Sequence, residues 1–509
     1  MATHPQPVRP LQTPLNERVP VVTNPSDYQR IREVLAAAGY TDRGITQVLG
    51  VDTLNRLGER KSPVLLRRTR GGTPLETLIR LFILGEPVDV LAATRAFAPM
   101  ELDDWRKNGL VSLEGSLVEP SLQLRCYQGM VIAYDFIRRG PGGLQRDYVM
   151  GVSPSSLVLA SMTVRRPIHS ALDLGSGCGI QALLAANHSE RVVGVDCNGR
   201  ALAISQFNSR LNRIENVQFR DGDMFGPVAG ETFELIVSNP PFIISPDNRH
   251  LFLNSGLESD DICRRIVREA PAFLSEGGYC VFNANWAVVE GEDWRARLAG
   301  WFEGTACDGL VILQGVQDLG EYAASLIEVG SNEQAEYTRH FNEWMDYYAA
   351  RRMTGIGQGV IVMRRAGARR NWFAVEDPPQ NIAFPSGDDV AQLVELQTFL
   401  HSLNHDSDLL DQFLKLAPNV RLEQTHGVVD GAWRQMSGRL CRVGGLEYSG
   451  SLDGQSAVAL AQIDGRRPLR ECLVQLAATL NTDPAVLVPS ALAVFRRLIE
   501  QGFVLPASF

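Results

Sequence analysis

The stretch Ala171-Leu172-Asp173-Leu174-Gly175-Ser176-Gly177-Cys178-Gly179 decides the fold. A short apolar run precedes three glycines at alternate positions, and a segment with helical character follows them. A chain that turns sharply from a strand into a helix needs glycines, because they adopt dihedral angles that other residues avoid and let a ligand approach the backbone. The stretch therefore predicts a strand–loop–helix unit of an α/β protein, with a ligand at the loop.

Apolar runs of strand length recur on the carboxyl side of this unit, and each is compatible with a strand that is covered on both faces. They are residues 191–195, 217–220, 234–237 and 279–282, with 309–313 and 360–363 as candidates for the final strands. Residues 199–212 and 259–274 suit connecting helices, and the polar segment 332–352 suits an inserted helix. This alternation is typical of a doubly wound parallel sheet, so we predict a Rossmann-like α/β domain over residues 148–385.

The glycine spacing and the carboxylates beyond it indicate the kind of ligand. A dinucleotide enzyme uses G-x-G-x-x-G to hold a pyrophosphate. Here the glycines are spaced G-x-G-x-G, and Asp173 lies two places before the first of them. The next strand ends in Asp196, 17 residues beyond Gly179, where a carboxylate can accept hydrogen bonds from ribose hydroxyls. A further strand leads to Asp223 and Met224.

This pattern resembles that of the class I methyltransferases, which take S-adenosylmethionine as cofactor. The resemblance implies these cofactor-binding residues: Asp173, Gly175, Gly177, Gly179, Asp196, Asp223 and Met224. The glycines would line the methionine part of the cofactor, and Asp173 would help to hold its ammonium, directly or through water. Asp196 would take the ribose hydroxyls. Asp223 would bind the adenine amino group, with the Met224 backbone at the ring nitrogen.

A second motif, Ser238-Asn239-Pro240-Pro241-Phe242, follows the apolar run that ends at Val237. The Asn239 side-chain oxygen and the Pro240 carbonyl can each accept a hydrogen bond from an NH₂ group whose lone pair is delocalised, and so orient it toward an electrophilic methyl. The prolines restrict the backbone, so these acceptors are preorganised. Phe242 offers an aromatic face to a planar target. No strong base is needed, because methylation makes the nitrogen acidic.

In this setting the segment resembles the N-P-P-[YF] motif of amino-methyltransferases, and the resemblance covers residues 148–290. That group includes release-factor glutamine methyltransferases, guanine-N2 ribosomal RNA methyltransferases and adenine-N6 enzymes of DNA or RNA. It implies that Asn239, Pro240, Pro241 and Phe242 form the catalytic segment. It also implies a macromolecular methyl acceptor, either a protein glutamine or a base of ribosomal RNA, transfer RNA or DNA.

One departure from the glutamine enzymes bears on this choice. They carry an R-P-x-T-E-like stretch before the glycine loop, whereas the corresponding region here is Val149-Met150-Gly151-Val152-Ser153-Pro154-Ser155-Ser156. The arginine and the acid are absent, which weakens the assignment to release factors. Ser155 or Ser156 can approach the cofactor carboxylate, but a helix cap is the favoured role for either.

Smaller modules are expected on both sides. Residues 1–25 are rich in proline and predict a mobile arm. Residues 26–147 predict helices, one capped by Ser26-Asp27 and one by Thr73 with Glu76, followed by a hairpin over 109–118, which suggests a winged-helix-like unit. Residues 386–509 predict further helices, over 388–403, 466–480 and 489–501, and a short final strand. These also suggest a winged-helix-like module.

Charge and composition narrow the partners. The chain carries 49 Lys+Arg and 58 Asp+Glu, a net charge of −9, which does not suit non-specific nucleic-acid binding. Residues 26–147 hold 17 Lys+Arg and 15 Asp+Glu, so this module is the candidate for presenting a substrate. A helical cap that only packs on the next domain is the alternative. Four arginine pairs would contact phosphates if they shared one face, and solvated surface is the other interpretation: Arg67-Arg68, Arg351-Arg352, Arg364-Arg365 and Arg369-Arg370.

Several classes are disfavoured. The eight cysteines are scattered without C-x-x-C spacing, which argues against structural zinc and disulfides. The apolar runs are shorter than the roughly 20 residues that cross a bilayer, and the start resembles no secretory signal, so we expect a cytoplasmic protein without a membrane partner. Trp286 is expected in the core or at a pocket rim rather than stacked on substrate.

Two other functions stay open at this point. The first is a nicotinamide-dependent oxidoreductase, which the glycine spacing and the Asn-Pro-Pro-Phe segment oppose. The second is a non-catalytic binding or regulatory protein on a methyltransferase scaffold, which the intact glycines and Asn239 oppose.

Overall fold

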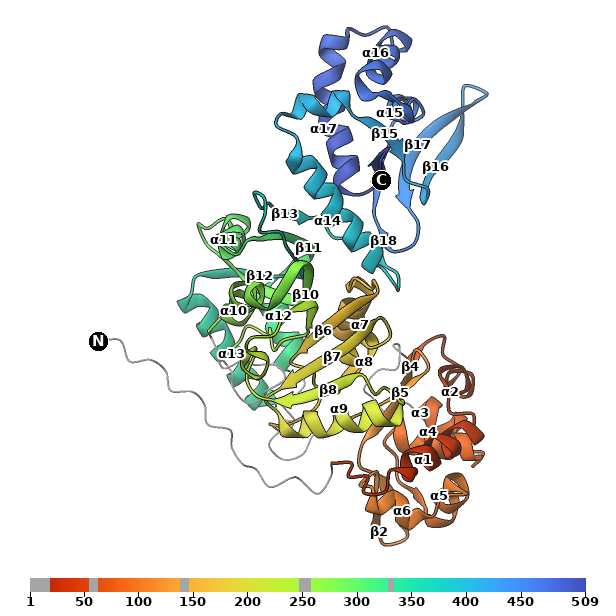
Figure 1. The fold of residues 1–509 in the computed structure, drawn as a ribbon. Helices are drawn as coiled ribbons and strands as arrows, with labels where there is room; N and C mark the ends of the chain where they lie inside the picture. Colours follow the sequence, from red (N-terminus) through yellow and green to blue (C-terminus); the bar gives the residue numbers. More distant parts are fainter. Residues whose placement is uncertain (1–18, 55–62, 138–145, 247–257, 328–333) are drawn as a thin grey trace, which may run out of the picture.

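An eight-stranded sheet lies at the centre of the molecule, with one smaller part of the chain at each end of it (Figure 1). The computed structural model describes residues 19–54, 63–137, 146–246, 258–327 and 334–509. The strand order is β13-β11-β12-β10-β9-β6-β7-β8. The strands are β6 (Ile168–Leu174), β7 (Ser189–Asp196), β8 (Val217–Asp221), β9 (Phe233–Ser238), β10 (Leu274–Val289), β11 (Cys307–Gln317), β12 (Met353–Arg365) and β13 (Phe373–Glu376).

Strands β6 to β10 run parallel, as the sequence predicts for a Rossmann-like sheet. The final strands differ from a purely parallel pattern, because β12 lies between β10 and β11 and is antiparallel to both. The chain leaves β11 and passes through α12 (Leu319–Ile327) and α13 (Gln334–Ala350) before β12 begins. The chain therefore enters β12 at the edge of the sheet where β11 ends, so β12 runs in the opposite direction to β11.

Helices cover both faces of the sheet, and the side chains of each strand alternate between two cores. Ala171 of β6 packs with Leu159 of α7 (Pro154–Met162) and Ala182 of α8 (Ile180–Ala185). Leu172 and Leu174 of the same strand instead join Ile266 of α10 (Asp261–Glu269). The remaining helices on these faces are α9 (Gly199–Leu211) and α11 (Trp294–Phe302).

The amino-terminal part folds as helices followed by hairpins. Its elements are α1 (Ser26–Ala37), α2 (Asp42–Leu49), α3 (Pro63–Arg68), α4 (Pro74–Phe82), β1 (Val88–Asp89), α5 (Val90–Phe97), α6 (Leu102–Lys107), β2 (Val111–Glu114), β3 (Leu117–Pro120), β4 (Gln123–Tyr127) and β5 (Met130–Tyr134). The capping box of Thr73 and Glu76 is confirmed, and so is the hairpin of β2 and β3. The helices of this part lead into that hairpin, which is the arrangement behind the winged-helix-like interpretation.

Two local predictions in this part are wrong. Ser26 does not cap α1, because it already lies inside the helix and its own N–H donates to Asn24 Oδ1 at 3.2 Å. The end of the expected mobile arm is packed. Val19 is buried, and the Val21 N–H donates to the Asn108 carbonyl at 3.2 Å. Apolar burial at Val19 explains this order. Residues 1–18 of the arm lie outside the described residues.

Asn208 of α9 and Asn212, the residue that follows this helix, attach the amino-terminal part to the central sheet domain. The Asn208 amide exchanges hydrogen bonds with the Ala133 N–H at 2.8 Å and the Ala133 carbonyl at 2.9 Å. Asn212 does the same with Val131, at 2.9 and 2.8 Å. Side-chain amides thus take the place of a neighbouring strand along β5. The second N–H of Asn208 reaches the Cys178 carbonyl of the glycine loop at 2.9 Å.

The carboxyl-terminal part shares a core with the sheet. Its elements are β14 (Asn381–Ile382), α14 (Gly387–Ser402), β15 (Phe413–Leu416), β16 (Val420–Val429), β17 (Ala432–Arg442), β18 (Leu446–Glu447), β19 (Ser449–Ser451), α15 (Gly454–Leu460), β20 (Asp464–Pro468), α16 (Leu469–Thr479), α17 (Pro484–Glu500) and β21 (Val504–Pro506). Val394 of α14 packs in one core with Val362 of β12 and Ile499 of α17.

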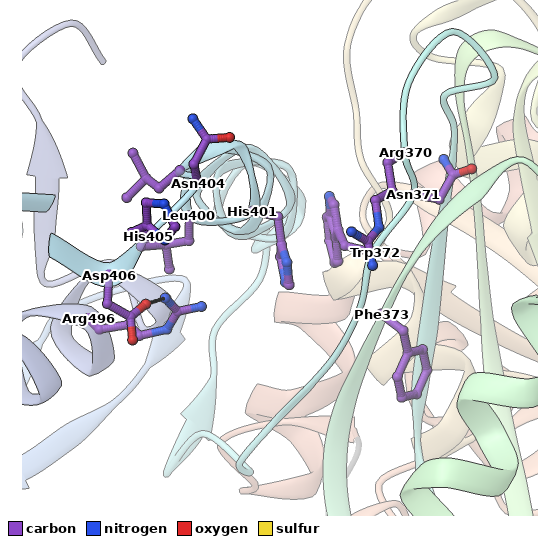
Figure 2. A pocket seen from close by; sticks show the side chains of 11 residues that line it. Arg370, Asn371, Trp372, Phe373, Leu400, His401, Asn404, His405, Asp406 and Arg496 are labelled. Carbon is purple, nitrogen blue, oxygen red and sulfur yellow. Dashed lines mark hydrogen bonds and ion pairs between the residues drawn. The ribbon is translucent and has the colours of Figure 1, made fainter. Parts of the chain in front are cut away.

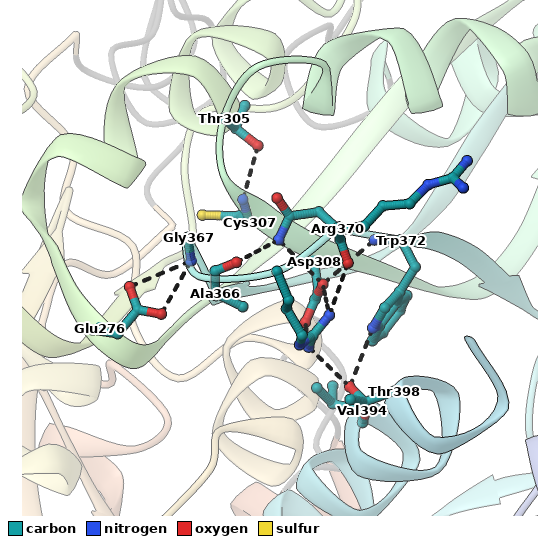
Figure 3. A network of polar contacts seen from close by, with 12 residues as sticks. Glu276, Thr305, Cys307, Asp308, Ala366, Gly367, Arg370, Trp372, Val394 and Thr398 are labelled. Carbon is teal, nitrogen blue, oxygen red and sulfur yellow. Dashed lines mark hydrogen bonds and ion pairs between the residues drawn. The ribbon is translucent and has the colours of Figure 1, made fainter. Parts of the chain in front are cut away.

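A polar network closes the same junction (Figure 3). The buried Asp308 carboxylate pairs with the Arg369 guanidinium, which also donates to Thr398 Oγ1 of α14 at 3.2 Å. The Trp372 indole N–H donates to the same hydroxyl at 3.1 Å. The Thr398 hydroxyl therefore accepts hydrogen bonds from two residues of the segment that leads into β13, and these bonds hold α14 against the edge of the sheet.

Two features of the carboxyl-terminal part differ from the sequence prediction. Helix α17 begins at Pro484, capped by Asp483, so Pro489 lies inside the helix instead of near its start. The long hairpin of β16 and β17 was not expected, and it extends away from the helices of this part (Figure 1). Across the described ranges of the chain, helices lack the combination of length and apolar character that crossing a bilayer requires.

Replacing Asn208 by alanine should destabilise the protein by roughly 2–4 kcal/mol. The change removes three hydrogen bonds and leaves buried backbone groups of Ala133 and Cys178 without partners. Urea unfolding of Asn208→Ala and wild type measures the difference. Gln206→Ala, at an exposed position of the same helix, is the control and should unfold like wild type. Equal midpoints for all three proteins would contradict the docking role of Asn208.

Candidate active site

The two sequence motifs meet because the parallel strands β7, β6, β9 and β10 are aligned in register. Leu174 of β6 pairs with Val195 of β7 and with Ser238 of β9, and Ser238 pairs with Phe282 of β10. The residues that come next in each strand form one row at the carboxyl edge, which we call the edge row: Asp196, Gly175, Asn239 and Asn283. The register places the glycine loop directly beside the Asn-Pro-Pro-Phe segment, although Gly175 and Asn239 are 64 residues apart along the chain.

The glycine loop has the shape of a ligand cradle. Gly175, Gly177 and Gly179 have φ angles of +73°, +54° and +82°, which residues with a side chain rarely adopt. A Cβ atom built on Gly175 or Gly177 would meet nothing within 4 Å, whereas one on Gly179 would lie 2.9 Å from the Ser205 Cβ. The first two glycines therefore face open space that a ligand can fill, and Gly179 allows close packing of α9.

Asp196 ties the loop to the end of β7. One carboxylate oxygen accepts from the Gly177 N–H at 2.7 Å and the other from the Asn198 N–H at 2.9 Å. Burial raises the pKa of this carboxyl, and these two backbone bonds oppose the shift. Each carboxylate oxygen has further lone-pair capacity, so hydrogen bonds to ribose hydroxyls are compatible with this geometry.

Asp173 lies beneath the loop and is almost fully buried. Its carboxylate accepts from the Ala182 N–H at 2.9 Å, in the first turn of α8. Burial is the main cause that raises the pKa of Asp173 to about 7, the Ala182 bond lowers it, and the nearby Asp196 raises it further. A cation bound nearby would offset the cost of burying this negative charge.

The two residues expected at the adenine are less enclosed. The exposed Asp223 carboxylate pairs with the Arg265 guanidinium of α10 at 3.1 Å. Met224 has a φ of +49° and packs partly buried against the core beside α10. Their roles toward adenine stay predictions.

The Asn-Pro-Pro-Phe segment is held at both ends. The Ser238 hydroxyl donates to the Leu174 carbonyl at 2.7 Å, which joins β9 to the strand before the glycines. The Phe242 N–H donates to the Pro240 carbonyl at 2.8 Å, so this carbonyl has one lone pair left to accept a hydrogen bond from an NH₂ group. Pro240 is buried, and the Phe242 ring is partly buried against the core.

Sequence reasoning missed the residues that hold the Asn239 side chain. The Asn283 Nδ2 group donates to Asn239 Oδ1 at 2.8 Å, and the Asn239 Nδ2 group donates to Ser155 Oγ at 3.3 Å. Ser155 does not cap α7 as expected, because the cap is Ser153, whose hydroxyl accepts from the Ser156 N–H. A signal existed for Asn283, since it is a polar residue directly after the buried run 279–282.

The inserted helices hold the chain just after the motif. The Ile244 N–H donates to the Tyr322 hydroxyl at 3.1 Å, and the Tyr348 hydroxyl donates to the Ile244 carbonyl at 2.9 Å. The buried Asn285 amide also donates to Tyr322, at 2.9 Å. Helices α12 and α13 therefore form a wall beside the candidate site, which the sequence indicated only as an insertion.

Two remaining site predictions can be settled. Trp286 is fully buried and its ring is tilted by 31° against that of Trp294, with centroids 5.3 Å apart, so it is a core residue. Two of the arginine pairs lie at opposite ends of one strand: Arg351-Arg352 precede β12, and Arg364-Arg365 are its last two residues. Arg352 pairs with Glu290 at 3.3 Å, and Arg369 with Asp308. The positive charges of these two arginines are thus paired with carboxylates of the same protein.

A separate hollow of about 460 Å³ lies away from the edge row (Figure 2). It opens between the segment before β13 and the end of α14, with Arg496 of α17 on one wall. Trp372 and His401 face each other across it with parallel rings, centroids 5.7 Å apart. It contains none of the residues predicted to bind cofactor or acceptor.

Comparison with known proteins adds to this geometry. The family model "Methyltransferase small domain" matches residues 151–290. Models of two domains of unknown function, DUF7059 and DUF7782, match residues 37–121 and 391–506. A release factor glutamine methyltransferase of Xylella fastidiosa is 34% identical over 216 residues, which is 38% of this chain and 74% of that protein.

Further relatives are matched over shorter stretches. A release factor glutamine methyltransferase of Aliivibrio fischeri is 33% identical over 26% of this chain and 50% of its own length. A ribosomal protein uL3 glutamine methyltransferase of Xanthomonas campestris is 34% identical over 23% of this chain and 42% of its own length. The chain thus spans about three quarters of the first relative and half or less of these two.

A Rossmann-like sheet that sets a glycine loop beside an Asn-Pro-Pro-Phe segment defines a methyltransferase that takes its methyl group from S-adenosylmethionine. The chain belongs to the class I family of these enzymes. A nicotinamide-dependent oxidoreductase is therefore excluded.

The affinity for S-adenosylmethionine should rise with pH between 6 and 7.5. Free Asp173 has a pKa of about 7 and is mostly neutral at pH 6. In the role predicted for Asp173, only its ionised carboxylate would attract the cofactor ammonium, which keeps its proton up to about pH 7.7. The dissociation constant should fall by up to roughly eightfold over this range, with proton release on binding.

Calorimetric titration in buffers of different ionisation enthalpy measures both effects. Asp173→Asn should bind more weakly above pH 7 and lose the pH dependence. A wild-type dissociation constant that stays flat from pH 6 to 7.5 would show that Asp173 does not interact with the ammonium.

Proposed function

We propose that the protein is an N-methyltransferase that methylates the side-chain amide of a glutamine in a protein. The observation that carries the proposal is the pair of acceptors at the end of β9, the Asn239 Oδ1 atom and the Pro240 carbonyl, in the row that also holds the glycine loop. The names of the relatives support a protein amide as the acceptor.

The residues of the edge row and the glycine loop fit the cofactor. S-adenosylmethionine, when bound, supplies an electrophilic methyl group. The open faces of Gly175 and Gly177 form the cradle for its methionine part. Asp196 would hold the ribose hydroxyls and Asp173 the ammonium, while Asp223 and the Met224 backbone would contact the adenine.

The chemistry of an amide explains why these acceptors are needed. The nitrogen lone pair of an amide is delocalised into its carbonyl group, so the free nitrogen is a poor nucleophile. Two acceptors that bind the two N–H groups hold the nitrogen in place and favour a localised lone pair. Asn239 and Pro240 supply one acceptor each, and the prolines fix their separation. Phe242 offers an apolar surface beside the planar group.

A nucleic-acid base with an exocyclic amine presents a similar NH₂ group, but no observation favours it over an amide. Two arginines of these pairs, Arg352 and Arg369, already have local carboxylate partners. The absence of the arginine and the acid from residues 149–156 separates this chain from the release-factor pattern. We therefore propose a protein glutamine without naming the protein that carries it.

The flanking modules are proposed to recognise that protein. The amino-terminal module, residues 26–147, is bound to the cofactor loop through Asn208. A substrate protein held by this module would be in a fixed position relative to the edge row. The carboxyl-terminal module, residues 386–509, is joined to the other end of the sheet through α14.

Replacing Asn239 by alanine should reduce methyl transfer by at least a thousandfold and leave the affinity for S-adenosylmethionine within about twofold of wild type, because an acceptor needed in the transition state is lost. The assay uses radiolabelled cofactor with a cell extract. We expect the label to enter macromolecules that protease degrades and nuclease does not. Gln206→Ala, at an exposed position of α9 outside both flanking modules, is the control and should transfer methyl groups like wild type.

Two results would contradict the proposal. Radiolabel found in RNA or DNA would show that the methyl acceptor is a nucleic-acid base and not a protein glutamine. Methyl transfer that persists in Asn239→Ala would show that Asn239 is not a catalytic residue.

A further inference from the structure

We propose that Asn283 is a positioning residue which, together with Ser155, decides which atom Asn239 presents to the methyl acceptor. The inference rests on the proposed role of Asn239 and extends it to the neighbouring strand. An asparagine amide can turn by half a rotation about its Cβ–Cγ bond, and its two ends have opposite hydrogen-bonding character. Only the orientation that presents Oδ1 can accept a hydrogen bond from an NH₂ group.

One backbone atom fixes the orientation of both amides. The Ser155 carbonyl oxygen can only accept, so the Asn283 atom that lies 2.9 Å from it must be Nδ2. The same Nδ2 group lies 2.8 Å from Asn239 and has one further N–H to donate. The Asn239 atom that faces it must therefore be an acceptor, which is Oδ1. Both N–H groups of Asn283 are used in this arrangement.

The other end of the Asn239 amide is held as well. Its Nδ2 group donates to Ser155 Oγ at 3.3 Å. That hydroxyl lies 2.9 Å from the hydroxyl of Ser153, the residue that caps α7. Ser155 thus belongs to the first turn of α7 and contacts both asparagines, through its carbonyl and its hydroxyl.

A rotated Asn239 would place two donors, the Nδ2 groups of Asn239 and Asn283, against each other. It would also turn Oδ1 away from Asn283 and lose that hydrogen bond. Asn283 is only 4% exposed, so water does not readily replace the missing partner. Asn283 accepts nothing from the substrate in this scheme, and its effect is exerted through Asn239 alone.

The register of the sheet explains why Asn283 can do this. Phe282 and Ser238 are paired across β10 and β9, so the residues that follow them are neighbours in the edge row. One lone pair of Asn239 Oδ1 is taken by Asn283, and the other is left for the acceptor amide.

The test compares two substitutions at one position, with turnover normalised to the number of cofactor-binding sites found by calorimetry. With radiolabelled cofactor and the protein fraction of a cell extract as acceptor, Asn283→Ala should lower the rate of label transfer by roughly 10- to 100-fold, with the dissociation constant of S-adenosylmethionine within about twofold of wild type. Its deficit relative to wild type should not change with pH.

Asn283→Asp supplies a signature that a merely structural role would not give. The neutral carboxyl has one O–H that can donate to Asn239 Oδ1, whereas the ionised form can only accept and would attract Asn239 Nδ2. The activity of this variant relative to wild type should therefore be highest at low pH and fall as the pH rises, by tenfold or more.

The outcomes separate the inference from the proposed function. If Asn239→Ala is inactive but Asn283→Ala keeps the wild-type rate of label transfer, the positioning role is overturned and the proposed function stands. Equal deficits of the two Asn283 variants at every pH overturn the positioning role too. If Asn239→Ala retains turnover, the proposed function fails, and the inference fails with it.

Discussion

The register of the parallel strands β6 to β10 is the constraint on which the rest of the structure depends. Side chains of a strand alternate between its two faces, so a slip of one residue would turn each side chain of that strand to the opposite side. With Leu174, Val195, Ser238 and Phe282 in one row, the next row holds the glycine loop and the polar groups around it. The hydrogen bonds of Asp196 to Gly177 and of Ser238 to Leu174 close this edge from strand to strand.

Features that depend on consecutive residues could be predicted from the sequence. The glycine loop, the Asn-Pro-Pro-Phe segment, the central strands and the Thr73 capping box are of this kind, because local backbone requirements determine their residues. Contacts between distant segments could not be predicted. Asn283 and Asn239 are 44 residues apart, and only the pairing of β9 and β10 shows that they meet. Ser155 was considered as a helix cap, because the serines of 153–156 are equivalent until one is seen to cap α7.

The course of the last strands also depends on long-range geometry. The apolar run 360–363 indicates a strand but not its direction, which follows from where α12 and α13 lie. The β16–β17 hairpin was missed because its outward side chains are mostly exposed and its pattern lacks a buried face. At α17 the helix includes Pro489, since packing of Phe495 and Ile499 stabilises a helix that a local rule would start later.

The contacts of Asn208 and Asn212 with β5 limit how the chain can be divided. A fragment that begins near residue 148 would contain the family's matched region, yet it would lose β5 and the partners of Asn208 and Asn212. It would also leave Arg200 without Asp135, its buried ion-pair partner, and expose the apolar side of α8 and α9 that packs on the amino-terminal helices. The catalytic region is therefore not an excisable unit. Its boundary in the sequence falls inside a continuous core, and expression trials need a start upstream of α1.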